Sequence, residues 1–134
     1  MPCWNTARFI GTQLEALARQ KVDDPWEVIM ADNGSSDDSR RIAEAFAAKL
    51  PLRIVDASQR RGAAHARNFG VLKAIGDVVV FCDSDDEVGE GFLAAMGRAL
   101  RQHELVACRF DFARLNHKVP VPERGHTTEV FPYT

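Results

Sequence analysis

The chain has 134 residues, of which 46% are hydrophobic and 27% charged, so its size and composition are those of one soluble globular domain. Its formal net charge of −2 provides no overall positive field to attract polyanions, and we expect no nucleic-acid partner. The longest apolar run, residues 78–82, is far shorter than the roughly 20 residues that span a bilayer. The 3 cysteines are widely spaced without a C-x-x-C pair, which indicates reduced thiols and a cytoplasmic location.

Apolar periodicity predicts that helices and strands alternate along the first hundred residues. Helices are predicted over 7–21, 36–50, 62–74 and 90–102, and short buried strands over 26–31, 52–55 and 78–82. Strands separated by single helices favour an α/β fold with three α/β/α layers and a mainly parallel, Rossmann-like sheet.

The C-terminal part of the chain has a different pattern. Residues 105–115 alternate between apolar and polar positions, which predicts a strand with one buried face. Residues 116–134 contain Pro120, Pro122 and Pro132 and show no clear period. We therefore divide the chain into a domain over 1–115 and an arm or loop over 116–134, and we expect the arm to reach a second copy in a homo-oligomer.

Two acidic segments follow predicted strands, at residues 32–37 and 83–87. The carboxyl ends of parallel strands are where open α/β sheets bind ligands. Clustered carboxylates repel one another unless a cation neutralises them, and oxygen ligands with room for water suit Mg²⁺ or Mn²⁺ shared with substrate phosphates. The competing interpretation is that both segments are ordinary acidic turns and helix caps.

Four motifs in register carry a resemblance to a known family. They are Met1-Pro2-Cys3-Trp4-Asn5, Ala31-Asp32-Asn33-Gly34-Ser35-Ser36-Asp37, Ala66-Arg67-Asn68-x-Gly70 and Phe81-Cys82-Asp83-Ser84-Asp85-Asp86. Together they resemble the nucleotide-sugar-binding half of a family 2 glycosyltransferase of the GT-A fold. The resemblance covers roughly residues 1–112.

The resemblance implies roles for the first two motifs. Pro2 and Asn5 match the loop after the family's first strand, beside the nucleotide base and ribose. Asp32 matches the carboxylate that accepts a hydrogen bond from the base. Trp4 stands where the family usually has a tyrosine near the base, with core packing as the alternative. Gly34 suits a turn that needs a left-handed backbone.

The resemblance also implies roles for the later motifs. Arg67 matches a basic residue that pairs with a carboxylate or with the diphosphate. Asp83 and Asp85 match the D-x-D motif, the first directed to ribose and the second to a divalent metal. Asp86 is expected to support them from behind. The implied function is donor binding for inverting transfer from a nucleotide-diphospho-sugar, a UDP-sugar, to a sugar or lipid-linked acceptor, and a lipid-linked acceptor would place the protein at a membrane surface.

Some parts of the family pattern are not found. The family begins with a strand before the Pro-x-x-Asn loop, and we expect that strand to be missing here, leaving 26–31 and 78–82 without their shared neighbour. No residue matches the family's catalytic base, so none is assigned and we expect this chain alone to be inactive in transfer. The alternatives are a haloacid-dehalogenase-like phosphatase, which also has D-x-D but normally Thr or Val where Glu87 stands, and a truncated nucleotide-binding module without turnover.

Overall fold

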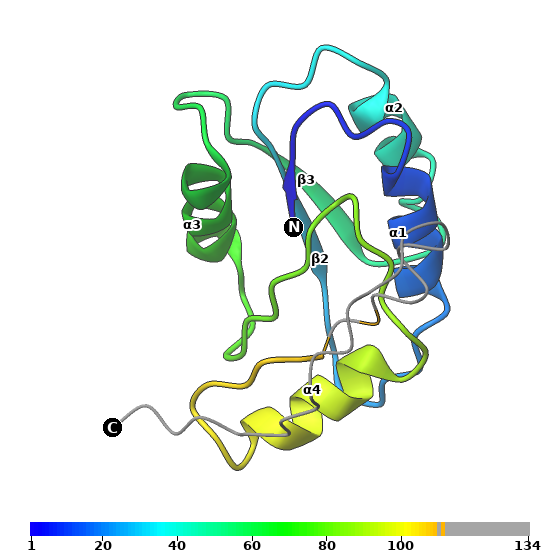
Figure 1. Ribbon diagram of the computed structural model, residues 1–134, viewed down its shortest axis with the longest axis vertical. Coiled ribbons are helices and arrows are strands. Elements are labelled where there is room, and N and C mark those ends of the chain that lie inside the picture. Colours follow the sequence, from blue (N-terminus) through cyan, green and yellow to red (C-terminus); the bar gives the residue numbers. More distant parts are fainter. Residues whose placement is uncertain (110, 112–134) are drawn as a thin grey trace, which may run out of the picture.

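The computed structural model describes residues 1–109 and 111, and these form three layers around a parallel sheet (Figure 1). The elements are β1 (Pro2–Cys3), α1 (Ile10–Ala18), β2 (Val28–Asp32), α2 (Ser39–Glu44), β3 (Leu52–Asp56), α3 (Ala63–Lys73) and α4 (Phe92–Leu100). The described strands form a 3-stranded sheet in the order β1-β2-β3. Helices α1 and α2 lie on one side of the sheet and α3 on the other, which confirms the expected α/β/α class.

The register of the sheet brings the ends of the strands to one edge. Cys3, the last residue of β1, pairs with Asp32, the last residue of β2, and Asp32 pairs in turn with Asp56 at the end of β3. The sequence predicted that the chain begins in the loop after the first strand, but the structure places Pro2 and Cys3 in that strand, parallel to β2. The loops that follow all three strands therefore meet at one edge.

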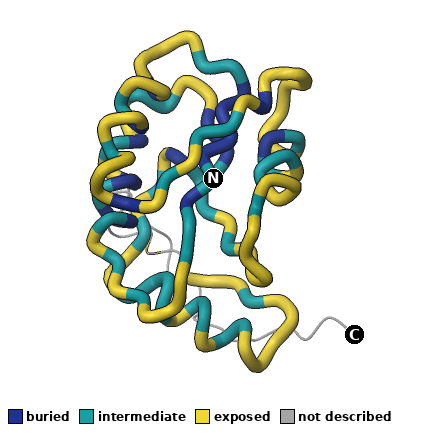
Figure 2. Tube along the Cα trace, turned by 180° about the vertical axis from the view of Figure 1, so that it is seen from behind, coloured by how far each residue is buried: buried dark blue, intermediate teal, exposed yellow. Residues whose placement is uncertain are grey.

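The larger core lies between the sheet and helices α1 and α2. Ile10, Leu14 and Leu17 follow one another at helical spacing along α1, and each is at most 2% exposed. They pack with Met30 of β2, which is fully buried. Phe9, an apolar residue just before this helix, is 44% exposed. Figure 2 shows the buried positions gathered on the inner sides of the elements.

The core on the α3 side is small and built from alanines. Ala31 of β2, Ala57 after β3 and Ala66 of α3 form it. Such short side chains let α3 approach the sheet closely. At Gly70 an added Cβ would lie 3.7 Å from the Cβ of Ala31 and 3.8 Å from Cγ2 of Ile29. Because Gly70 has no side chain, α3 lies close to β2 at this residue.

The C-terminal end of α3 is held by an ion pair on the sheet. Arg53 of β3 donates to the carboxylate of Glu27 at 2.8 Å and to the carbonyl of Lys73 at 3.1 Å. The other carboxylate oxygen of Glu27 accepts the N–H of Ile75 at 3.0 Å. Backbone groups that the end of the helix leaves unpaired are satisfied in this way.

The predicted strand over 78–82 is wrong for this structure. Val78, Val79 and Phe81 are 55%, 40% and 53% exposed, and the segment belongs to none of the described strands. Apolar content favours a strand only where a neighbour offers a ladder, and β1, beside which this segment was expected, has 2 residues. Leu72 near the end of α3 and Ile75 just after that helix are also exposed.

The remaining predictions concern the C-terminal half of the chain. Helix α4 forms where a helix was expected, although none of its residues is fully buried. Residues 105–109 form no strand, and the rest of 105–115 apart from Asp111, like the arm over 116–134, lies outside the described residues. In the part of the chain that is described, no helix has the length and apolar character needed to cross a membrane.

The close approach at Gly70 predicts opposite effects for a small and a large side chain. Gly70→Ala makes ordinary contacts with β2 and removes a flexible residue from a helix, so it should raise the free energy of unfolding by about 0.5–1 kcal/mol. Gly70→Leu must displace β2 and should lower it by about 1–3 kcal/mol. Urea unfolding measures both, with Gly97 of α4, which has open space around it, as the matched control. Equal stability of Gly70→Leu and Gly97→Leu would contradict the packing described.

Candidate functional site

A pocket of about 610 Å³ opens at the edge where the strands end. Its walls come from β1 and the residue after it, the residue after β2, and the start of α3 with the residues just before it. The last wall comes from the first residues of 83–87, called the acidic loop below, which follow the 78–82 segment. The lining residues are Pro2, Cys3, Trp4, Asn33, Arg61, Gly62, Ala63, Ala66, Arg67, Asp83, Ser84 and Asp85. Four sequence motifs distant along the chain therefore meet at one cavity.

Asn33 holds the wall that leads into α3. This residue is only 4% exposed. The Nδ2 of its side chain donates to the carbonyl of Ala57 at 2.5 Å and to that of Arg60 at 2.7 Å. Its Oδ1 accepts the N–H of Gly62 at 2.8 Å. One amide thus satisfies three backbone groups of the segment that connects β3 to α3, and fixes where the helix begins.

Asn5 supports a neighbouring loop and does not line the pocket. Its backbone is left-handed, with φ 53°, a conformation that asparagine tolerates better than most residues. Its Oδ1 accepts the N–H of Ser36 at 2.8 Å, and its own N–H donates to Oγ of Ser35 at 3.1 Å. The side chain that the resemblance placed beside the nucleotide instead joins the loop after β1 to the loop after β2.

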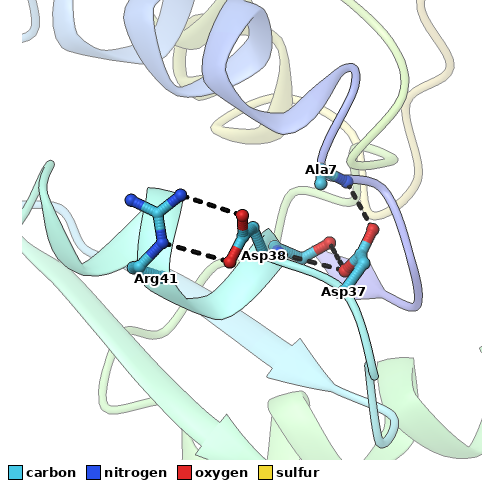
Figure 3. A network of polar contacts seen from close by, with 5 residues as sticks. Ala7, Asp37, Asp38 and Arg41 are labelled. Carbon is cyan, nitrogen blue, oxygen red and sulfur yellow. Dashed lines mark hydrogen bonds and ion pairs between the residues drawn. The ribbon is translucent and has the colours of Figure 1, made fainter.

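The same two loops are joined a second time, as Figure 3 shows. Asp37 accepts the N–H of Ala7 at 2.9 Å, and Asp38 pairs with Arg41 through two hydrogen bonds of 3.1 and 2.9 Å. Hydrogen bonds from Arg41, together with its charge, hold the pKa of Asp38 below its usual range. These two carboxylates act as local supports at the start of α2 and are not part of the pocket lining.

Asp32 also lies outside the pocket lining. It is 7% exposed, and its Oδ1 accepts the N–H of Ser35 at 2.9 Å, which closes the turn after β2. Gly34 within that turn has the positive φ, 80°, that the sequence predicted. Of the six site residues expected from the sequence, the structure brings together Pro2, Arg67, Asp83 and Asp85, and leaves Asn5 and Asp32 as loop supports.

Charges of both signs meet at the pocket. Arg67 of α3 donates to Oδ1 of Asp83 at 2.5 Å, so the structure contains the carboxylate pairing that was one of its two expected roles. Asp85 lines the pocket nearby and is exposed. Burial, followed by the charges of Asp83 and Asp85, raises the pKa of Asp86, as expected where carboxylates crowd one another.

The pocket lining also contains Arg61, for which the sequence favours a solvated helix entry over a contact with phosphates. The guanidinium of Arg61 lies over the ring of Trp4, 5.1 Å from its centroid, and donates to the carbonyl of Asn33 at 3.1 Å. Both side chains line the pocket. The segment around Arg61 resembles a solvated helix entry in the sequence, and only the turn imposed by Asn33 brings it to the site.

Gln13 of α1 holds the acidic loop from behind, and the sequence analysis did not select it. The residue is fully buried, its Nε2 donates to the carbonyl of Asp83 at 3.0 Å, and its Oε1 accepts the N–H of Val88 at 3.0 Å. The signal available in the sequence was a polar residue within the apolar stripe of this helix. Such a residue buried in a core requires hydrogen-bond partners.

The carboxylates offer part of a metal site. Among the described residues, no three His, Cys, Asp or Glu side chains lie together as a complete set of metal ligands. Mg²⁺ and Mn²⁺ take oxygen ligands and are often held by one or two carboxylates together with substrate phosphates. Asp85, exposed at the pocket, fits such a shared site, while Asp83 is already paired with Arg67.

Fold and site together define the class of the protein. A parallel sheet between helices, with a pocket at its carboxyl edge and a D-x-D segment in the wall, is the GT-A arrangement of nucleotide-sugar-dependent transferases. The chain matches the family model described as Glycosyl transferase family 2 over residues 1–130, and it belongs to that family.

Relatives and solved structures agree with this membership. The chain is 34% identical over 116 residues to the uncharacterized glycosyltransferase YfnE of Bacillus subtilis, covering 86% of this chain and 30% of that protein. The crystal structure of Staphylococcus aureus TarS 1–349 in complex with UDP-GlcNAc matches with a TM-score of 0.65 and 29% identity, over 77% of this chain and 30% of that chain. TarS 1–349 in complex with UDP matches with a TM-score of 0.64 and 28% identity, over 77% of this chain and 31% of that chain. The chain thus spans about a third of the length of YfnE and of each TarS 1–349 chain.

The three hydrogen bonds of Asn33 predict a large effect from its removal. Asn33→Ala leaves two carbonyls and one N–H without their partner, so the free energy of unfolding should fall by about 1–3 kcal/mol. Urea unfolding measures this loss, and Asn68→Ala on the exposed side of α3 is the matched control. A loss no larger than that of the control would show that this amide does not hold the wall.

Proposed function

We propose that the pocket binds the nucleoside diphosphate of a UDP-sugar, with Mg²⁺ or Mn²⁺, as the donor site of an inverting glycosyltransferase. The observation that carries the proposal is the set of chemical groups on one cavity. The ring of Trp4, the guanidinium groups of Arg61 and Arg67, and the carboxylates of Asp83 and Asp85 all line it. An aromatic face suits a base, guanidinium groups suit phosphate oxygens, and carboxylates suit ribose hydroxyls or a divalent ion.

The relatives support the choice of donor. Two of the matching crystal structures are complexes of TarS with UDP-GlcNAc and with UDP, and both align over 77% of this chain. A pocket of about 610 Å³ is within the usual range for a small-molecule ligand. A uridine nucleotide is therefore the donor class that we propose, and the identity of its sugar is left open.

Each of four residues of the pocket would contact a different part of the donor. Trp4 would stack on the base, and Asp83 would accept a hydrogen bond from the ribose, as the family resemblance implies. Arg67 has N–H groups beyond the one that holds Asp83, and these can donate to the diphosphate. Asp85 would hold the divalent ion, which when bound supplies the charge neutralisation that lets a nucleoside diphosphate depart.

Transfer needs an acceptor and a base in addition to the donor. We propose a sugar or lipid-linked acceptor, and assign no base among the described residues, because both carboxylates that line the pocket already have roles. The phosphatase alternative loses its support with the family match. The alternative of a nucleotide-binding module without turnover has the same donor site. It differs in that the whole protein would transfer no sugar to an acceptor.

The metal role of Asp85 predicts a loss of metal-dependent binding. Asp85→Asn keeps the size of the side chain but removes its charge, so the affinity for UDP in the presence of Mn²⁺ should fall by about 10-fold or more, as for other metal-site changes. Titration calorimetry with UDP, with and without Mn²⁺, measures this effect.

The matched control for Asp85→Asn is Glu87→Gln, which makes the same change of charge in the same acidic run but outside the pocket lining. The control should bind UDP with Mn²⁺ like the unmodified chain. If the unmodified chain binds no UDP with Mn²⁺ present, the proposed function is wrong. If Asp85→Asn and Glu87→Gln behave alike, the metal assignment is wrong.

The stacking role of Trp4 predicts a loss that depends on the base. Trp4→Ala should weaken UDP binding by about 5- to 100-fold, the effect of about 1–3 kcal/mol of stacking, whereas Trp4→Phe should retain most of the affinity. Pyrophosphate with Mn²⁺ carries no base, and its affinity should be unchanged in Trp4→Ala. Equal losses for UDP and pyrophosphate would contradict stacking and point to the packing alternative.

A further inference from the structure

The acidic loop reaches the pocket without the support of a regular strand. Residues 78–82 form no ladder with the sheet, so backbone pairing does not fix the position from which Asp83 and Asp85 project. A metal and diphosphate site requires carboxylates held to within a fraction of an ångström. Some other contact must therefore hold this loop.

Two glutamines, Gln13 of α1 and Gln20 just after that helix ends, make that contact. Gln13 donates to the carbonyl of Asp83 and accepts the N–H of Val88, so its amide spans the loop at both ends. Gln20, seven residues further along, donates to the carbonyl of Gly89 at 2.9 Å and accepts the N–H of Leu93 at 3.2 Å. The first clamps the residues that carry the carboxylates, and the second clamps the start of α4.

The two glutamines differ in how firmly they are held. Gln13 is fully buried among Ile10, Leu14 and Leu17, which are themselves buried, so its amide has little freedom to exchange one partner for another. Gln20, which follows the end of α1, is partly exposed, and its Nε2 also donates to the carbonyl of Ala16 in that helix at 3.2 Å. Of these two glutamines, Gln13 is the one that combines full burial with bonds to both ends of the acidic loop.

We infer that Gln13 is a positioning residue for the donor site, setting the place of Asp83 and Asp85 through the backbone of their loop. This role rests on the proposed donor function. Gln13 does not line the pocket, so it acts through the loop rather than on the ligand. Its removal should free the loop and weaken those interactions that need the carboxylates in place, while binding of the base through Trp4 should persist.

The test compares Gln13→Met, within α1, with Gln20→Met, just beyond the end of that helix. Both variants make the same chemical change. Met matches Gln in length but cannot form either hydrogen bond. Without any ligand, exchange of the Val88 N–H with solvent deuterium should become faster in Gln13→Met and stay unchanged in Gln20→Met. With Mn²⁺ present, the affinity for pyrophosphate and for UDP should fall by about 10-fold or more in Gln13→Met only, as for changes behind a metal ligand.

The two measurements separate the inference from the proposed function. Unchanged exchange at Val88 in folded Gln13→Met, or unchanged Mn²⁺-dependent pyrophosphate binding, overturns the positioning role. If the unmodified chain binds neither UDP nor pyrophosphate, the proposed function is overturned. Faster exchange of Val88 in Gln13→Met would then still show that Gln13 holds the loop. Should Gln13→Met fail to fold, Gln13→Asn keeps the amide on a side chain one methylene shorter, which cannot reach both Asp83 and Val88. Normal Mn²⁺-dependent affinity in that variant overturns the role as well.

Discussion

The buried amide of Asn33 is the interaction on which the geometry of the pocket depends. Loops at the ends of parallel strands carry backbone groups that the sheet no longer pairs, and burying such groups unpaired is costly. Asn33 satisfies three of them at once, at Ala57, Arg60 and Gly62. Because Gly62 directly precedes α3, the same bonds determine where that helix starts and where Arg67 projects.

Neutral side chains position both walls of the pocket, which leaves the charged ones for a ligand. Asn33 holds the wall that carries the two arginines, and Gln13 holds the wall that carries the carboxylates. The ion pair between Arg67 and Asp83 is the direct link between these walls. The diphosphate and divalent ion proposed as ligands of this pocket would bring a matching pair of opposite charges to the same place.

Much of the fold was accessible from the sequence because periodicity reports which faces are buried. Helix α1 and strand β2 were expected within a few residues of where they lie, and Arg67, Asp83 and Asp85 were expected at one site. The strand predicted over 78–82 is not found, because apolar content does not indicate whether a neighbouring strand can pair with the segment.

Side-chain direction within turns was the second limit on what the sequence could predict. The motifs placed Asn5 and Asp32 at the correct edge of the sheet, but a short polar side chain in a turn can bond a loop backbone instead of facing a cavity. Asp32 bonds its own turn in this way, and Asn5 bonds the neighbouring loop. Gln13 is a polar position within an apolar helix face that was not selected from the sequence, and its partners lie 70 and 75 residues away, so only the fold identifies them.

The ion pair at the far end of α3 gives the molecule a sensitivity to acid. A hydrogen bond from the N–H of Ile75, and further ones from Arg53, hold the pKa of Glu27 below its usual range. A carboxyl group whose pKa is lower in the folded than in the unfolded chain stabilises the fold above its unfolded-state pKa, and this contribution is lost as the pH falls through the folded-state pKa. Acidification therefore loosens α3 at the end opposite to the pocket, where its last carbonyl depends on Arg53 being held by a charged Glu27.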